Sequence, residues 1–125
     1  LRALLGAELM SGAEVALDTV NFDEFLQRAA LVVTGEGRMD EQTLQGKLPV
    51  AVARHARRAQ VPVIAFPGSV GHGAVDALRS QYDGIFPVHR GEPRPEMLVS
   101  AAGQLLDAVR RSCTQIRSLV KIEGA

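Results

Sequence analysis

Apolar and polar residues alternate along the chain in blocks, and their spacing predicts strands in some blocks and helices in others. Short apolar runs that include β-branched residues are typical of strands buried on both faces. The expected strands span residues 30–34, 61–66 and 84–88. Before and between these strands, helical spacing with capping residues or a proline at the start predicts helices. The expected helices span residues 1–10, 12–19, 22–28, 50–60 and 73–81, with a single turn over 40–43.

The last expected helix is the longest. Its apolar residues recur at spacings of three and four, which predicts one apolar stripe along about seven turns. Cys113 lies in this stripe, so we expect a buried, structural thiol. The stripe comprises Leu98, Ala102, Leu105, Val109, Cys113, Ile116 and Val120.

Strands that alternate with helices predict a parallel sheet with right-handed crossovers. We therefore expect the α/β class: a three-layer, Rossmann-like domain portion with about three strands, flanking helices and a long C-terminal helix. A length of 125 residues suits one domain. However, a three-stranded sheet leaves two apolar edges unpaired, and the chain opens at Leu1 without Met. We expect the chain to be a fragment whose sheet edges pair with an absent part of the protein or with another chain.

Composition argues against several classes of partner. Lys plus Arg equals Asp plus Glu at 14 each, whereas nucleic-acid-binding domains usually carry a basic excess. No apolar run approaches the ~20 residues that span a bilayer, and no signal peptide is visible. A single cysteine allows no internal disulfide, which favours a reducing, cytoplasmic setting. We therefore expect neither nucleic acid nor a membrane as a partner.

The loop after the first expected strand concentrates glycine and charge. In α/β sheets, ligands bind at loops that follow the carboxyl ends of strands. Gly35 and Gly37 can take positive φ and let the backbone approach a ligand closely. Arg38 suits a carboxylate or phosphate, and Glu36 or Asp40 suits a water-mediated Mg²⁺ ion or a substrate proton.

A purely structural interpretation of this loop stays open. Asp40 can cap a helical turn, Arg38 can pair with Glu36, and the glycines can simply turn the chain. Lys47 likewise is either a solvated lysine or a cation that meets an anion where the next helix begins.

A second glycine turn, P-G-S-V-G-H-G at 67–73, follows the second expected strand and also suits a phosphate. Well-known motifs do not fit these turns. The Gly46-Lys47 pair lacks the other residues of a Walker A loop, and the second turn lacks the spacing of a dinucleotide site. No nucleophile elbow and no histidine spacing of a metal site occur. The basic cluster Arg54, His55, Arg57 and Arg58 predicts a solvated face, or otherwise an anion or partner surface.

The run V-V-T-G-E-G-R-M-D-E-Q-T-L-Q-G-K-L-P-V-A-V-A-R at 32–54 resembles the signature of bacterial glycerate kinases, which phosphorylate D-glycerate with ATP. The run V-P-V-I-A-F-P-G-S-V at 61–70 resembles their second glycine turn, although Phe66-Pro67 replaces smaller residues. The resemblance implies a two-domain α/β kinase. Residues 1–125 would be the C-terminal part of its Rossmann-like domain, without the N-terminal strand, its D-S-F-K-G-S segment and the second domain.

The resemblance also implies an active site between two domains, with ATP and Mg as cofactors and phosphorylation of glycerate at the 2-position. Within it we expect Asp40 as a base or metal-side carboxylate, Arg38 on the glycerate carboxylate or a phosphate, and Lys47 on the transferring phosphoryl group. The expected substrate- and phosphate-binding residues are Gly35, Glu36, Gly37, Thr43, Gly46, Gly68 and Ser69.

Such a fragment holds only part of a site, so we expect no appreciable kinase activity from the isolated chain. The expected partners are glycerate and ATP, and either a homo-oligomer or pairing with the absent part stays open. The alternative function is a non-catalytic assembly or binding module that pairs its sheet edge with another chain.

Overall fold

The computed structural model of this chain describes residues 10–71, 75–89 and 100–120. Three strands form a parallel sheet in the order β1 (Val32–Thr34), β3 (Val63–Ala65), β5 (Gly84–Ile85). The α/β class, the parallel sheet and the long last helix are therefore confirmed. In the register, Val32 lies beside Val63, and Ile64 lies beside Gly84. All residues of β3 are buried, as the central position of this strand requires.

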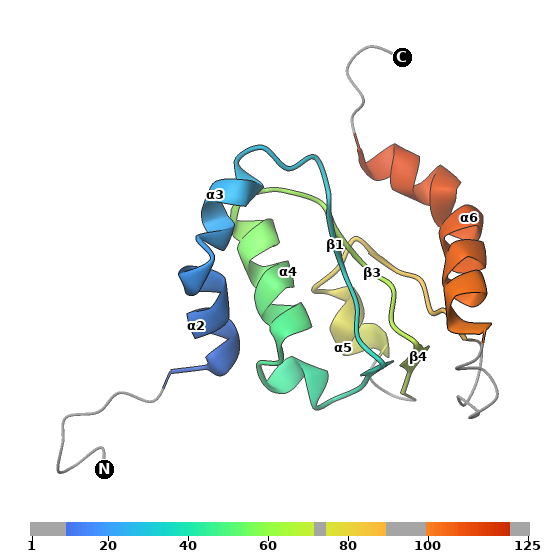
Figure 1. The fold of residues 1–125 in the computed structure, drawn as a ribbon, viewed down its shortest axis with the longest axis horizontal. Helices are drawn as coiled ribbons and strands as arrows, with labels where there is room; N and C mark the ends of the chain where they lie inside the picture. Colours follow the sequence, from blue (N-terminus) through green and yellow to red (C-terminus); the bar gives the residue numbers. More distant parts are fainter. Residues whose placement is uncertain (1–9, 72–74, 90–99, 121–125) are drawn as a thin grey trace, which may run out of the picture.

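Helices cover both faces of the sheet, which gives three layers (Figure 1). On one face lie α2 (Gly12–Thr19), α3 (Phe22–Leu26) and α4 (Leu48–Arg58). On the other lies α6 (Ala101–Leu119). A short helix, α5 (Val75–Arg79), precedes β5. None of the helices in the described part of the chain has the length and apolar character needed to cross a bilayer.

The core lies between α4 and the sheet. Pro49 occupies the first turn of α4, where its fixed φ is favourable and its missing N–H is not needed. From there the small and β-branched residues of α4 pack on the strands, because small side chains let a helix approach a sheet closely. The buried cluster comprises Leu26, Val32, Met39, Val50, Ala53, Ala56, Val61, Val63, Ala65, Leu78 and Tyr82.

Most expected elements are present with shifted or shorter bounds. The helix over 12–19 has the expected ends, whereas the strands extend over only two or three residues each. The expected helix over 1–10 and the start of the one over 73–81 lie mainly outside the described residues. The turn expected over 40–43 is followed by a 3-10 helix, η1 (Thr43–Gln45). A small parallel sheet of β2 (Arg38–Met39) and β4 (Ser69–Val70) was not expected.

The expected burial of α6 is wrong in detail. Cys113 is exposed, and Leu105 in the same stripe is 42% exposed. The buried residues of this helix are instead Ala108 and Ser112, and the Ser112 hydroxyl donates to the Ala108 carbonyl at 3.0 Å. Small residues therefore face the sheet layer, and the apolar stripe is turned partly away from it. Leu98 lies outside the described residues.

An open apolar groove results between α6 and the outer part of the sheet. Val33 of β1 is 58% exposed there. Its neighbours across the groove are apolar side chains of the α6 stripe. The groove is lined by Leu31, Val33, Thr34, Gly35, Ile64, Phe66, Leu105, Val109 and Ile116.

Candidate functional site

The two glycine turns lie side by side at the carboxyl ends of β1 and β3. The Gly68 N–H donates to the Glu36 carbonyl at 2.8 Å, and the Ser69 N–H donates to the Gly37 carbonyl at 3.1 Å. A third bond, from the Gly71 N–H to the Met39 carbonyl, measures 2.8 Å. These bonds extend the parallel pairing beyond the main sheet, so the two loops form one rigid surface.

The glycines of these turns permit backbone contact rather than an unusual φ. A Cβ atom at Gly35 would lie 2.7 Å from the carbonyl oxygen of Phe66, and one at Gly68 would collide with the carbonyl oxygen of Gly37. Among the described glycines, only Gly46 has a positive φ, at +99°. The expected positive φ at Gly35 and Gly37 is therefore wrong.

Glu36, Thr43 and Asp40 form a hydrogen-bonded chain inside the first loop. The Thr43 hydroxyl donates to Glu36 Oε1 at 2.8 Å and accepts the Asp40 N–H at 3.1 Å. Thr43 is fully buried, and the side chain of Glu36 is 15% exposed. Both residues thus hold the shape of the loop, and the Thr43 hydroxyl is already engaged on both sides.

Three charged groups point outward from this frame. Arg38 lies with its Nε 4.0 Å from Asp40 Oδ2, and these side chains are 47% and 32% exposed. Lys47 lies with its Nζ 3.9 Å from Glu36 Oε2 and is 44% exposed. Both distances are long for ion pairs, and the two cations are partly exposed, so these contacts contribute little to stability. The cations are therefore accessible to an anion.

The structural interpretation of Asp40, as the cap of a helical turn, is confirmed. One of its carboxylate oxygens remains accessible for a chemical role. Asp40 Oδ1 accepts the Gln42 N–H at 3.0 Å, and its carbonyl accepts the Thr43 N–H at 3.0 Å. Asp40 therefore caps the turn that leads into η1. Its Oδ2 lies 4.0 Å from Arg38 Nε, and Oε2 of Glu36 lies 3.9 Å from Lys47 Nζ.

The two carboxylates fit a magnesium ion only in a limited way. No cluster of three or more His, Cys, Asp or Glu side chains occurs among the described residues. One oxygen of each of Glu36 and Asp40 already accepts a hydrogen bond. A Mg²⁺ ion that keeps waters and phosphate oxygens as its main ligands needs only one or two carboxylates, and the half-exposed Asp40 fits that role better than Glu36.

Ser69 and Lys47 occupy contrasting positions around the loop. Ser69 is 4% exposed, and its hydroxyl has no hydrogen-bond partner within the described ranges. Lys47 is the extended residue immediately before α4, so its backbone lies at the positive end of that helix, which also favours an anion.

The basic cluster on α4 is not a uniform solvated face. His55 is 5% exposed, with Nδ1 2.6 Å from Asp23 and Nε2 2.8 Å from Glu14. Burial opposes the charged imidazole, but the two carboxylate contacts prevail and raise the pKa of His55. The same contact with His55 lowers the pKa of Glu14. Arg54 also bonds Glu14, at 2.7 Å, so this part of the cluster holds α2 and α3 against α4.

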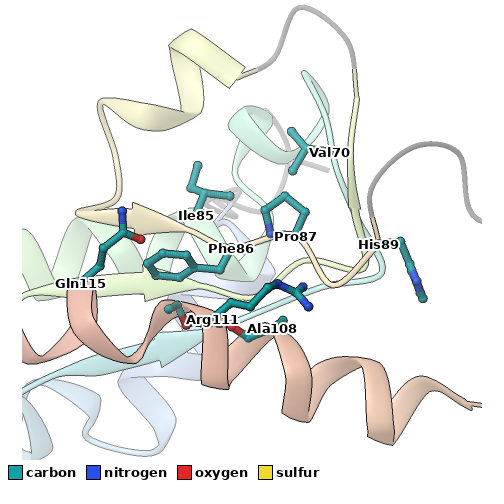
Figure 2. Close-up of a pocket in the computed structure, with 9 residues that line it drawn as sticks. Val70, Ile85, Phe86, Pro87, His89, Ala108, Arg111 and Gln115 are labelled. Atoms are coloured by element: carbon teal, nitrogen blue, oxygen red, sulfur yellow. Dashed lines mark hydrogen bonds between the residues drawn. The ribbon is translucent and has the colours of Figure 1, made fainter.

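A pocket of about 370 Å³ lies between α6 and the segment that follows β5 (Figure 2). The His89 N–H donates to the Gly68 carbonyl at 2.9 Å, so the pocket adjoins the second glycine turn. His89 follows the third expected strand, which places it at the same edge of the sheet as the loops. The position of His89 after an expected strand could therefore have indicated this site from the sequence. No nearby residue in the sequence indicates that Arg111 lies across the pocket from it. The lining is Val70, Ile85, Phe86, Pro87, His89, Ala108, Arg111, Ser112 and Gln115.

Comparisons with known proteins give one consistent relationship. A glycerate kinase of Bacillus subtilis is 33% identical over 121 residues, which are 97% of this chain and 32% of that protein. A glycerate kinase of Halalkalibacterium halodurans is 44% identical over 69% of this chain and 23% of its own length. A glycerate 2-kinase of Escherichia coli is 40% identical over 70% of this chain and 23% of its own length.

The fold agrees with these relatives. A solved structure assigned as glycerate kinase 2 from Salmonella typhimurium LT2 superposes with a TM-score of 0.64 at 32% identity, over 94% of this chain and 30% of that one. The chain thus spans about a fifth to a third of the length of the curated relatives that it matches. The model of the glycerate kinase family matches residues 1–118. This chain therefore belongs to the glycerate kinase family.

Proposed function

We propose that these residues serve ATP-dependent phosphorylation of D-glycerate, at the 2-hydroxyl, as part of a larger kinase. Family membership supports the reaction class, and one relative is named a glycerate 2-kinase. The observation that carries the proposal is the loop itself. Arg38, Asp40 and Lys47 present accessible charges from a frame that buried hydrogen bonds hold in place.

The proposed reaction transfers the γ-phosphoryl group of ATP to the glycerate hydroxyl. A new O–P bond forms as the bond to ADP breaks, and the hydroxyl proton passes to a carboxylate. Asp40 is the proposed acceptor, through Oδ2, because Oδ1 accepts the Gln42 N–H. Positioning and charge stabilisation dominate catalysis of this kind. Arg38 is therefore proposed to hold the glycerate carboxylate or a phosphate, and Lys47 to neutralise charge on the transferring group.

Glu36 and Thr43 are proposed as positioning residues, because their side chains bond each other inside the loop. Gly35 and Gly68 would keep the two turns together, because each meets the backbone of the other turn. Gly37, Gly46 and Ser69 are proposed to lie beside the phosphates. When bound, Mg²⁺ would shield phosphate charge, and holding that ion through water is the alternative role proposed for Asp40. ATP and magnesium use, and the cytoplasmic setting, rest on the kinase class.

We propose further that residues 1–125 are the C-terminal part of a Rossmann-like domain in a two-domain enzyme. The outer edge of β1 and the apolar groove beside α6 support this, since Val33 is 58% exposed there and unpaired strand edges promote further pairing. The short coverage of the relatives agrees with it.

A coupled assay of ADP release on the full-length gene product tests the reaction. Asp40→Asn and Arg38→Ala should each lower kcat/KM by at least about a hundredfold, consistent with the loss of a charge that acts in the transition state. Arg57→Ala, on the exposed side of α4, is the matched control and should change little. Full activity in both loop variants would overturn the assignment of this loop to the active site. Turnover by the isolated 125-residue chain would overturn the hypothesis that it is a fragment.

The same groove also supports the second candidate, a non-catalytic module that adds its sheet edge to another chain. A full-length product that shows no glycerate-dependent ADP release, yet forms a stable complex blocked by Val33→Lys, would favour this function. Glycerate-dependent turnover would exclude it as the main role.

A further inference from the structure

The pocket between α6 and β5 has one apolar end and one cationic end. Figure 2 shows Phe86 and Gln115 at one side and His89 at the other, with the Arg111 side chain reaching beneath Pro87 toward the His89 side. Among the described residues, those that line it include no carboxylate. An anion at the Arg111 end would therefore meet attraction from the guanidinium and no opposing charge from the walls.

The apolar end is stiff and of a size that suits an aromatic ring. Phe86 packs against Phe66 with ring centroids 5.5 Å apart, and the Phe86 N–H donates to the Ala65 carbonyl at 2.9 Å. Ile85 belongs to the sheet itself. A volume of about 370 Å³ lies within the usual range for small-molecule sites. The amide of Gln115 stands at this end and can donate to or accept from the edge of a base.

The cationic end opens toward the candidate site. The Val88 N–H donates to the Pro67 carbonyl and the His89 N–H to the Gly68 carbonyl, both at 2.9 Å. The next residue, Ser69, pairs in register with Arg38. His89 Nδ1 is buried with no hydrogen-bond partner in the described residues, a cost that a bound polar group can offset. A ligand with an apolar ring and a charged tail would therefore point its tail at the glycine turns.

From the apolar end and the cationic end of this pocket we infer that it holds the nucleoside end of the nucleotide. The base would lie between Phe86 and Gln115, and the α- and β-phosphates beside Arg111. This deepens the proposed function and rests on it for the identity of the nucleotide. The terminal phosphate then lies toward the turn at Gly68 and the charges of Arg38 and Lys47. The pocket is thus assigned to ATP and ADP rather than to glycerate.

Titration of the 125-residue chain with ATP, adenosine and tripolyphosphate tests the assignment by binding alone. Arg111→Ala should weaken ATP binding about tenfold or more, as expected for losing a charge-assisted contact, and leave adenosine binding nearly unchanged. Gln115→Ala should weaken ATP and adenosine by the same factor and leave tripolyphosphate unchanged. Arg117→Ala removes the same charge from the same helix outside the pocket and should have no effect.

Several results would overturn the inference. One such result is an unchanged affinity for ATP in Arg111→Ala. Another is an equal loss of affinity in Arg117→Ala, because the effect would then come from the overall positive charge of the helix and not from the pocket. Tripolyphosphate could bind as tightly as ATP, which would remove the base from the pocket. On the full-length product, Arg111→Ala should raise the KM for ATP and not that for glycerate. If the wild type binds ATP through Arg111 but shows no glycerate turnover, the proposed function fails while the pocket assignment stands.

Discussion

Thr43 donates its hydroxyl proton to Oε1 of Glu36 over 2.8 Å, from a position with no exposed surface. The hydroxyl oxygen of Thr43 also accepts the N–H of Asp40. One hydroxyl group therefore connects the start, the middle and the end of the loop that carries the charged residues.

Removing this hydroxyl should loosen the loop. Thr43→Val keeps the volume but leaves the Asp40 N–H and Oε1 of the mostly buried Glu36 without these hydrogen bonds, which typically costs about 1–3 kcal/mol. Urea unfolding of the chain should show this loss. Thr43→Ser keeps both hydrogen bonds and should recover most of the stability and, in the full-length product, most of the activity. A Thr43→Val variant as stable as the wild type would show that the hydroxyl contributes nothing to the stability of the loop.

Gly68 should not tolerate a side chain. A Cβ atom there would overlap the carbonyl oxygen of Gly37, so Gly68→Ala must push the two turns apart, at a cost of about 1–3 kcal/mol, the usual range for overpacking. Gly37→Ala is the control, because no atom lies within 4 Å of its Cβ position. Hydrogen exchange of the Ser69 and Gly71 amides should accelerate in the first variant and not in the second.

The contact of His55 with two carboxylates should make stability depend on pH in two opposite ways. The raised pKa of His55 means that its contribution is fully present below its ordinary value of 6.5 and is lost as the pH rises through the raised pKa. The lowered pKa of Glu14 means that its contribution is present above the ordinary 4.5 and is lost as the pH falls through the lowered pKa. The stability that this cluster contributes should therefore be greatest between the two ordinary pKa values, 4.5 and 6.5.

Unfolding free energies measured by urea across this pH range check the prediction. The double variant Glu14→Gln and Asp23→Asn removes both negative charges and should flatten the alkaline decline, because neutral amides no longer favour the imidazolium. A decline of the same size in the variant would place its origin elsewhere in the chain.

The hydroxyl group of Tyr82 should contribute nothing to the stability of the fold. Its side chain is 4% exposed, the oxygen has no partner within the described residues, and burial, with a smaller effect of Glu36, raises its pKa. Tyr82→Phe removes an unsatisfied polar group, so the unfolding free energy should stay within about 1 kcal/mol of wild type or increase. A loss above that size would reveal a bond to the hydroxyl.

The sequence was most informative where local chemistry decides the structure. Helix 12–19 and the three strands follow from periodicity, and Pro49 marks the start of α4 correctly. The pairing of β2 with β4 could not be predicted in this way, since it depends on backbone contact between turns about thirty residues apart (Arg38 beside Ser69) rather than on hydrophobic spacing.

Side-chain surroundings were harder to predict than elements. His55 stands among arginines, so it resembles a solvated residue, but its partners Asp23 and Glu14 lie 32 and 41 positions away. The stripe of α6 was identified correctly as apolar, but periodicity does not say which face meets the sheet. The close approach allowed by Ala108 and Ser112 decides that orientation.

The turned face of α6 has a practical consequence. The single thiol of the chain, Cys113, is exposed on the helix that carries Arg111 and Gln115 to the pocket. A fluorophore attached there needs no engineered cysteine and sits two positions along the chain from each of these pocket residues. Its emission would report on occupancy of the pocket in real time, in the wild-type sequence.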